Sequence, residues 1–256
     1  MSSAVGMQDA RAVAYRALSL GALLTRSDLE ISFQHLESYD LPAHLEERLG
    51  LRHQQRNQAL EQWLNTEEIR PHLSQSERQL LAKPFGTWTD LNLIHASWRV
   101  EALGSMLWAL GHLDAMPEFD TQFEVEDVLR PLDVLTPVID FVWLAQLRPA
   151  QELYEMRDRA ELWNWRSRAL ELERMGVRPA NGLRFAEIVR QTAEKAHELG
   201  HLSNLIEGDF PAFGRPYCGL SPSQQRLIGA IASERYQALS WLCEMSVEWE
   251  NLPVDR

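Results

Sequence analysis

Residues 87–112 read TWTDLNLIHASWRVEALGSMLWALGH, and their pattern decides the fold class. Apolar side chains recur at spacings of three and four, which is the period of an α-helix. These side chains fall on opposite sides of the helix: Ile94, Trp98 and Trp108 on one, and Leu93, Val100, Leu103, Leu107 and Leu110 on the other. A helix that is apolar nearly all round is buried among other elements. We therefore predict a central helix here, capped by Thr87 with Asp90 three residues later.

Helical periodicity extends along the rest of the chain, and no run of alternating β-branched residues bounded by hairpin turns interrupts it. The other expected helices cover residues 9–24, 27–36 with Ser27 as cap, 42–64, 74–83 with Ser74 and Glu77 as a capping box, 138–147, 149–175, Asn181 or Gly182 to 199, and 223–245. We predict one compact all-α domain over residues 1–256, with about eight to ten helices and little or no β-sheet. Residues 1–8 are expected to be a disordered N-terminus, and residues 208–222 a Gly/Pro-rich loop.

The charge balance limits the classes of partner. The chain has 25 Lys and Arg against 37 Asp and Glu, so its formal net charge is −12. A phosphate backbone would be repelled, which argues against nucleic acid and favours a basic or metal-bearing partner. The longest apolar runs fall far short of the ~20 residues that a membrane span needs, and the N-terminus lacks the pattern of a secretory signal. With only two cysteines, Cys218 and Cys243, the chain is predicted to be cytoplasmic and without a disulfide framework.

Two glutamates interrupt otherwise apolar helix faces. Glu101 lies on the tryptophan-bearing face of the central helix, and Glu234 lies in the apolar seam of the last helix. A buried carboxylate costs several kcal/mol unless it is paired, so each needs an arginine, a hydroxyl, a metal or a raised pKa. Arg99, Arg166 and Arg235 are the candidate partners. The pattern predicts either a buried Glu–Arg network that fixes helix packing or a carboxylate pair for metal binding or acid–base chemistry.

A short segment from His197 to His201 reads HELGH, the H-E-x-x-H pattern of zinc peptidases. On a helix the two histidines share one face and can bind one Zn²⁺, with Glu198 as the general base and Glu207 as a third ligand. Gly200 argues against this, because a glycine here ends a helix in a left-handed turn and would carry His201 out of it. Zinc peptidases also lay their substrate along a sheet edge, and no sheet is predicted. The segment is therefore either a zinc site or a helix end.

Five stretches of the chain are distinctive: ARAVAYRALSLGALL (residues 10–24), ASWRVEALGSMLWALG (96–111), DFPAFGRPY (209–217), IASERYQALSWLC (231–243) and WENLPVD (249–255). Together they resemble the bacterial family called domain of unknown function 4272. The resemblance implies a helical cytoplasmic domain, and it carries no activity, cofactor or catalytic residue over to this chain. The family pattern contains the six residues of a candidate buried polar site: Trp98, Arg99, Glu101, Glu234, Arg235 and Trp241. It contains no H-E-x-x-H, so the HELGH segment departs from it.

Three functional hypotheses follow. The first is a non-enzymatic binding or interaction module, for instance an immunity-type or regulatory partner, which fits the −12 charge, the Trp-rich helices and the lack of a complete catalytic set. The second is a ligand- or metal-binding enzyme that uses Glu101 and Glu234, with Arg99 or Arg235 holding an anion. The third is a zinc hydrolase at the HELGH segment. We expect a protein partner, no nucleic acid, no membrane and no cofactor other than zinc in the third case.

Overall fold

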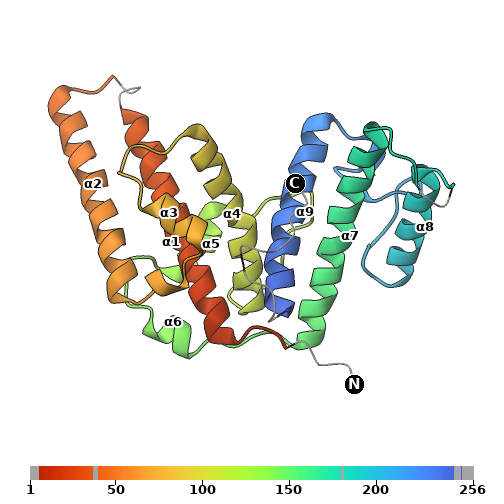
Figure 1. Ribbon diagram of the computed structural model, residues 1–256, viewed down its shortest axis with the longest axis horizontal. Helices are drawn as coiled ribbons and strands as arrows, with labels where there is room; N and C mark the ends of the chain where they lie inside the picture. Colours follow the sequence, from red (N-terminus) through yellow and green to blue (C-terminus); the bar gives the residue numbers. More distant parts are fainter. Residues whose placement is uncertain (1–5, 37–39, 180–181, 245–248, 250–256) are drawn as a thin grey trace.

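The structure, a computed structural model, describes residues 6–36, 40–179, 182–244 and 249. In this part of the chain nine α-helices are joined by loops and short 3₁₀ turns, and the only sheet has two strands of two residues (Figure 1). The fold is therefore all-α, as predicted. The first five helices are α1 (Ala10–Gln34), α2 (Ala43–Thr66), α3 (Gln75–Leu81), α4 (Asp90–Ala109) and α5 (Val125–Leu129). They are followed by α6 (Ile139–Trp143), α7 (Ala150–Arg174), α8 (Phe185–Glu198), β1 (Pro211–Ala212), β2 (Arg215–Pro216) and α9 (Pro222–Cys243).

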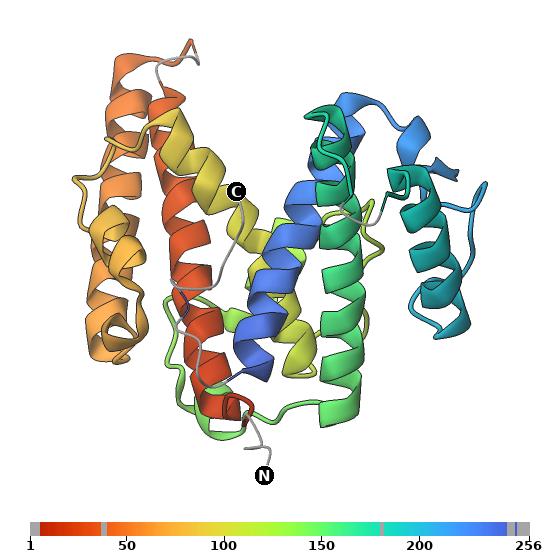
Figure 2. The ribbon, with the colours of Figure 1, turned by 45° about the vertical axis from the view of Figure 1, so that its right-hand side comes forward.

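Helix α4 is the centre of the array. It packs against α1 on one side and against α9 on the other, and two views show it between these helices (Figures 1 and 2). Helix α2 packs on α1, α7 packs along α9, and α8 packs on α7. Residues 101–110 are all buried, which confirms the prediction of a central helix. Among the helices of the described residues, none is both long and apolar enough to cross a membrane.

The close approach of Phe123 to α4 depends on a glycine at position 104. A Cβ atom built on Gly104 would lie between 2.4 and 2.5 Å from three atoms of the Phe123 ring. We expect Gly104→Ala to lower the free energy of unfolding by about 1–3 kcal/mol, because the ring would have to move within a packed core. Urea unfolding measures this loss, with Ser97→Ala on the exposed side of α4 as the control. An unchanged unfolding midpoint in Gly104→Ala would contradict the described packing.

The start of α4 differs from the predicted one by two residues. Thr89, not Thr87, caps the helix: its hydroxyl accepts from the backbone N–H of Asn92, whose side chain accepts from the backbone N–H of Thr89. The hydroxyl of Thr87 instead donates to the carbonyl of Pro84. Asn92 can complete this capping box because its amide oxygen accepts a hydrogen bond, as a side-chain oxygen of Glu or Gln would. The helix ends at Ala109, a little before the predicted end.

The first two predicted helices are one helix. Helix α1 continues without a break through Ser27, so the predicted cap at this residue is wrong. Around it, the guanidinium of Arg26 pairs with the carboxylate of Glu30 at 2.7 Å, and both side chains are buried. A continuous helix holds these two residues four positions apart on one face. Packing of this pair therefore overrides the local capping preference of serine.

Other boundaries shift where the chain is rich in loops. The predicted helix over 138–147 is the shorter α6, and α5 was not predicted. Helix α8 begins at Phe185 rather than at Gly182, whereas Asn181 and the predicted helix end at Met245 lie outside the described residues. Within the predicted loop 208–222, β1 and β2 pair antiparallel. A tight hairpin is possible because Phe213 and Gly214 both adopt positive φ.

Part of the predicted disordered N-terminus lies against the core. Residues 1–5 are outside the described residues, but residues 6–8 are described. The backbone N–H of Gln8 donates to the carbonyl of Leu242 at 2.9 Å, and Met7 packs on the core. The chain therefore reaches α1 along the end of α9, and Asp9 then caps α1 by accepting from the N–H of Ala12.

Candidate functional site

The predicted polar site consists of two charge pairs between α4 and α9. Glu101 pairs with Arg235 at 2.8 Å, and Arg99 pairs with Glu234 at 2.9 Å. Neither side chain of the first pair is exposed (0%), whereas 19% of each side chain of the second pair is exposed. The burial predicted for Glu101 is confirmed, and Glu234 is only partly buried. The structure thus brings these residues together as two Arg–Glu pairs rather than as two carboxylates that face one site.

Arg235 ties three parts of the chain together. Its Nε donates to Glu101, and its two terminal nitrogens donate to the carbonyls of Pro117 at 2.6 Å and Thr121 at 2.8 Å. The other oxygen of Glu101 accepts from the backbone N–H of Phe123 at 3.1 Å. The pair therefore holds the loop between α4 and α5 against α4 and α9. These hydrogen bonds are all made to groups inside the protein.

The protonation of this pair fits a structural role. Burial raises the pKa of the Glu101 carboxyl, and Arg235 and the N–H of Phe123 oppose that rise. Burial also lowers the pKa of the Arg235 guanidinium, and Glu101 opposes that fall. Both contacts of Glu101 come from N–H donors, so they fit the ionised carboxylate. A catalytic acid or base must reach a substrate atom, and no part of these side chains is open to solvent.

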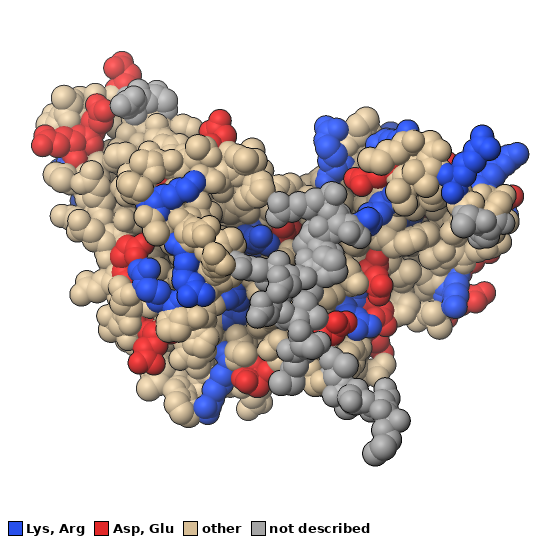
Figure 3. Space-filling view, viewed as in Figure 1, with Lys and Arg blue, Asp and Glu red and all other residues tan. Residues whose placement is uncertain are grey.

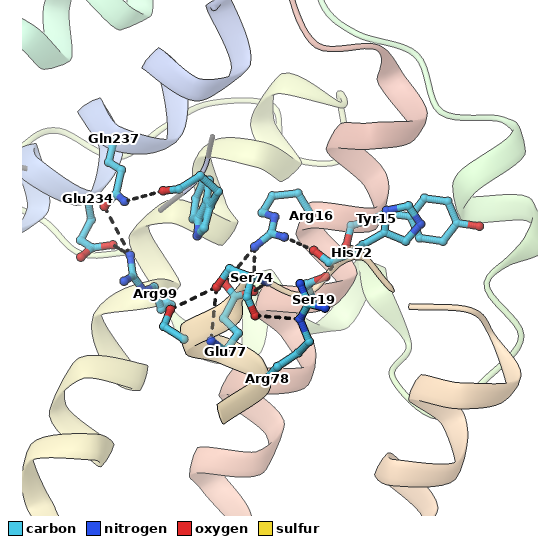
Figure 4. Close-up of polar contacts among 12 residues, drawn as sticks. Tyr15, Arg16, Ser19, His72, Ser74, Glu77, Arg78, Arg99, Glu234 and Gln237 are labelled. Carbon is cyan, nitrogen blue, oxygen red and sulfur yellow. Dashed lines mark hydrogen bonds and ion pairs between the residues drawn. The ribbon is translucent and has the colours of Figure 1, made fainter. Parts of the chain in front are cut away.

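The half-buried pair belongs to a polar cluster where α1, α3, α4 and α9 meet (Figure 4). Arg99 also donates to the side chain of Gln237 at 3.4 Å, and Gln237 donates to the carbonyl of Trp249 at 3.4 Å. The Trp249 ring stands edge-on to that of Trp241, with 5.6 Å between centroids. Trp98 is half-buried and packs on the core. The cluster therefore anchors Trp249, which follows the end of α9, against the helices.

A buried pair that was not predicted from the sequence lies beside this cluster. One nitrogen of Arg16 in α1 donates to both oxygens of Glu77 at 2.9 and 2.8 Å, and another donates to the carbonyl of His72 (Figure 4). Glu77 also accepts from the backbone N–H of Ser74, in the capping box that was predicted for α3. The available signal was an arginine inside the apolar run of α1, which parallels Glu101 in α4.

Arg166 has a different partner from the one predicted. It pairs with Asp209 in the loop before β1 through two hydrogen bonds of 2.7 and 2.8 Å, and both side chains are buried. Asp209 also accepts from the backbone N–H groups of Phe210 at 2.8 Å and Cys218 at 2.9 Å. This pair therefore fastens the segment from Asp209 to Cys218 onto α7, and Arg166 does not reach Glu101 or Glu234 as an ion-pair partner.

Helix α8 ends inside the HELGH segment. Its last residue is Glu198, and Gly200 adopts a φ of +79°. The N–H groups of Gly200 and His201 return to carbonyls of the last turn at 3.0 and 2.8 Å, which is the Schellman type of helix ending. The helix end predicted at Gly200 is confirmed, and His201 lies beyond the helix.

The predicted zinc ligands are not brought together. His201 has left the helix that carries His197, and the His197 ring contacts the carbonyl of Leu202 at 2.9 Å. Glu207 adopts a positive φ of 53° in a later turn. In the described residues, no group of three or more His, Cys, Asp or Glu side chains is arranged to hold a metal ion. The sequence has the H-E-x-x-H spacing, but His201 is not on the helix. The two histidines therefore do not share the helix face that the zinc site requires.

The end of α8 forms one wall of a cleft against α7, which we call the acidic cleft. Its volume is about 530 Å³, and its lining includes Trp108, Glu152, Glu155, Asp158, Leu199 and His201. No sequence pattern predicts this cleft, because it arises where α8 turns back onto α7. Three carboxylates less one arginine, Arg159, give the lining a local charge of −2, which attracts cations.

The carboxylates of the acidic cleft differ in their partners. Glu152 pairs with Arg148 at 3.5 Å, and Asp158 pairs with Arg157 at 2.6 Å. Glu155 accepts a hydrogen bond of 2.7 Å from the uncharged amide of Gln151, and it pairs with no cation in the described part of the chain. The negative charge of Glu155 is therefore the one most available to a partner.

Together these features define a class: an all-α protein with internally paired charges and a concave acidic surface. The family model described as "Domain of unknown function (DUF4272)" matches residues 2–183, and the chain belongs to this family. The stretches after residue 183 that carried the resemblance lie outside the matched residues. No curated protein and no solved structure matches the chain.

Proposed function

We propose that the chain is a non-enzymatic binding module whose acidic cleft receives a basic segment of a protein partner. The observation that carries the proposal is the cleft of about 530 Å³ between α7 and the end of α8, with three carboxylates in its lining. Charge complementarity of this kind speeds encounter and fixes the register of a complex. The net charge of −12 also attracts a basic partner, over longer distances than the cleft itself. An immunity-type or regulatory partner would bind in this way.

Two residues of the acidic cleft suit it to a basic side chain. Glu155 is exposed and offers a carboxylate without a counter-ion in the described residues. Leu199 exposes 63% of its surface in the same cleft. Lys and Arg combine a cationic head with a long apolar stem, so one such side chain can contact both residues.

The embedded charges favour a binding role over a catalytic one. Glu101 and Arg235 are engaged with each other and with backbone groups, and both are closed to solvent. Glu234 pairs with Arg99 on α4. Catalysis by an acid or base requires a side chain within reach of a substrate proton. An enzyme that used Glu101 and Glu234 would depend on carboxylates that are already paired with arginines. A zinc hydrolase would depend on two histidines that do not share a helix.

We also propose that the module acts in the cytoplasm. Cys218 and Cys243 are both free thiols, and Cys218 is exposed. An exposed free thiol persists in a reducing compartment, whereas oxidising compartments favour disulfides.

Binding of a fluorescein-labelled nona-arginine peptide to the full chain tests the proposed cleft. We expect the double variant Glu152→Gln/Glu155→Gln to weaken binding about tenfold, because the loss of two charge-assisted contacts removes at least about 1.4 kcal/mol. The matched control is Glu46→Gln/Glu47→Gln, which makes the same change in net charge near the start of α2, on the other side of the molecule (Figure 1). Fluorescence anisotropy at constant ionic strength gives both affinities.

We expect the control to change the affinity by less than about twofold, since screened charges on α2 act only weakly at that distance. Both double variants should keep the wild-type unfolding midpoint, because exposed charges contribute at most about 1 kcal/mol. Equal weakening by the two variants would mean that the peptide responds to net charge alone. That result, or wild-type affinity in the cleft variant, would remove the acidic cleft as the binding site.

A further inference from the structure

A second pocket, which we call the arginine pocket, lies between α7 and the start of α9 and shares no lining residue with the acidic cleft. Its volume is about 230 Å³, and its charged lining residues are Arg168, Arg174, Arg226 and Glu171. Three arginines less one glutamate give a local charge of +2, in a chain whose net charge is −12. Figure 3 shows Lys and Arg side chains gathered at this end of the molecule, around the end of α7 and the start of α8. The pocket is therefore a basic site on a protein whose net charge is negative.

The floor of the arginine pocket is polar and buried. Tyr217 and Ser167 are 1% and 7% exposed, and their hydroxyl oxygens lie 2.6 Å apart. The Tyr217 hydroxyl donates to the carbonyl of Gln225 at 3.3 Å, and a phenol has only one proton to donate. Ser167 therefore donates to Tyr217, and both hydroxyl protons are used inside the protein. Burial raises the pKa of Tyr217, which keeps the phenol protonated at neutral pH.

Gly229 of α9 leaves space at this floor. A Cβ atom built on Gly229 would lie 3.1 Å from Oγ of Ser167, which is tighter than an ordinary contact. A glycine in a helix interior is unfavourable relative to alanine, so the chain keeps it here at a cost to helix stability. The missing side chain leaves the Ser167 hydroxyl accessible from the pocket that it lines.

Arg226 is the cation most open to a ligand. Its side chain is exposed at the pocket and makes no hydrogen bond or ion pair within the described residues. Arg174 donates one hydrogen bond to the side chain of Gln225, and this contact leaves its other nitrogens for a further acceptor. Guanidinium groups bind phosphate oxygens through paired, charge-assisted hydrogen bonds.

We propose that the arginine pocket binds a small molecule through its phosphate group. Arg226 and the remaining nitrogens of Arg174 supply the charge-assisted donors that a phosphate group requires. A volume of about 230 Å³ holds a phosphate with a small organic group attached, and it is small for a folded partner segment. The occupant is therefore a phosphate monoester of low molecular mass.

Calorimetric titration of the full chain with phenyl phosphate and with inorganic phosphate tests this proposal. We expect saturable binding of both, with phenyl phosphate the tighter ligand and uncharged phenol without measurable binding. Arg226→Gln should weaken phenyl phosphate binding about tenfold, because a charge-assisted contact is lost. Gly229→Ala should abolish binding, since its methyl group would fill space at the pocket floor beside Ser167. Arg56→Gln on α2 is the matched control and should leave the affinity unchanged.

Three results would overturn the proposal. Equal weakening of phenyl phosphate binding by Arg226→Gln and Arg56→Gln would mean that the ligand responds only to the net charge of the protein. Wild-type binding in Gly229→Ala would place the ligand elsewhere, and Arg174→Gln makes the same test if Gly229→Ala does not fold. A phosphoserine peptide that bound more tightly than phenyl phosphate would replace the small molecule with a phosphorylated protein partner.

Discussion

Replacement of Arg235 by methionine is expected to lower the free energy of unfolding by about 3–5 kcal/mol. The substitution leaves the Glu101 carboxylate buried without its cation, and it leaves the carbonyls of Pro117 and Thr121 without their donors. Urea unfolding followed by circular dichroism measures the loss. Arg99→Met is the matched control on the same pair of helices, and we expect a loss of about 1 kcal/mol because this pair is partly exposed to solvent.

The double variant Glu101→Met/Arg235→Met removes both charges of the ion pair, so its stability shows how much of the loss in Arg235→Met comes from an unpaired buried charge. We expect it to be more stable than Arg235→Met alone, because no unpaired charge then remains in the core. Part of the loss should remain, since the N–H of Phe123 and the loop carbonyls lose their partners. Losses that simply add would show that the two side chains are not coupled, and would contradict the described pair.

Asp209→Asn is expected to cost about 3–5 kcal/mol at neutral pH. The carboxylate accepts two hydrogen bonds from Arg166 and one each from the N–H groups of Phe210 and Cys218. An amide offers only one acceptor oxygen, and its NH₂ group would face an N–H donor. Asp120→Asn is the control, because Asp120 accepts only one backbone hydrogen bond and is partly exposed. Urea unfolding of both variants gives the comparison.

The loss in Asp209→Asn should depend on pH. Burial alone would raise the pKa of Asp209, but Arg166 and the N–H groups of Cys218 and Phe210 outweigh burial and hold the pKa below its usual value. Such a carboxylate adds stability that is complete above its unfolded pKa, about 3.9, and is lost as the pH falls through the folded value. The stability gap between wild type and variant should therefore be constant above about pH 5 and shrink below about pH 4. A gap that grew on acidification would show the opposite shift.

Features that depend on one segment could be predicted from the sequence. The all-round apolar pattern of α4 and the burial of Glu101 follow from spacing within one helix. Gly176 and Gly200 end their helices with φ of +74° and +79°, because the left-handed conformation is a local preference of glycine. The choice of Arg235 rather than Arg99 as the partner of Glu101 depends on how α4 crosses α9, and no local pattern fixes that crossing.

Features that depend on distant segments were missed for the same reason. Among the described residues three further ion pairs are buried: Arg16–Glu77 and Arg166–Asp209 join distant segments, and Arg26–Glu30 lies within α1. Arg16 and Arg26 interrupt the apolar run of α1 and could have been found by the reasoning applied to Glu101. The partners Glu77 and Asp209 come from other elements, as do the walls of the acidic cleft and of the arginine pocket. Their positions follow from tertiary packing.

Stability and peptide binding, measured together on two variants, test the central claim that the embedded charges maintain the fold while the acidic cleft binds a basic partner. Glu101→Gln is expected to lose about 3–5 kcal/mol of stability and, where it is folded, to bind the arginine peptide with wild-type affinity. If it does not fold, Glu101→Met/Arg235→Met takes its place. Glu152→Gln/Glu155→Gln is expected to keep its stability and to lose about tenfold in affinity. A folded Glu101 variant without peptide binding, or a cleft variant with wild-type affinity, would contradict the account.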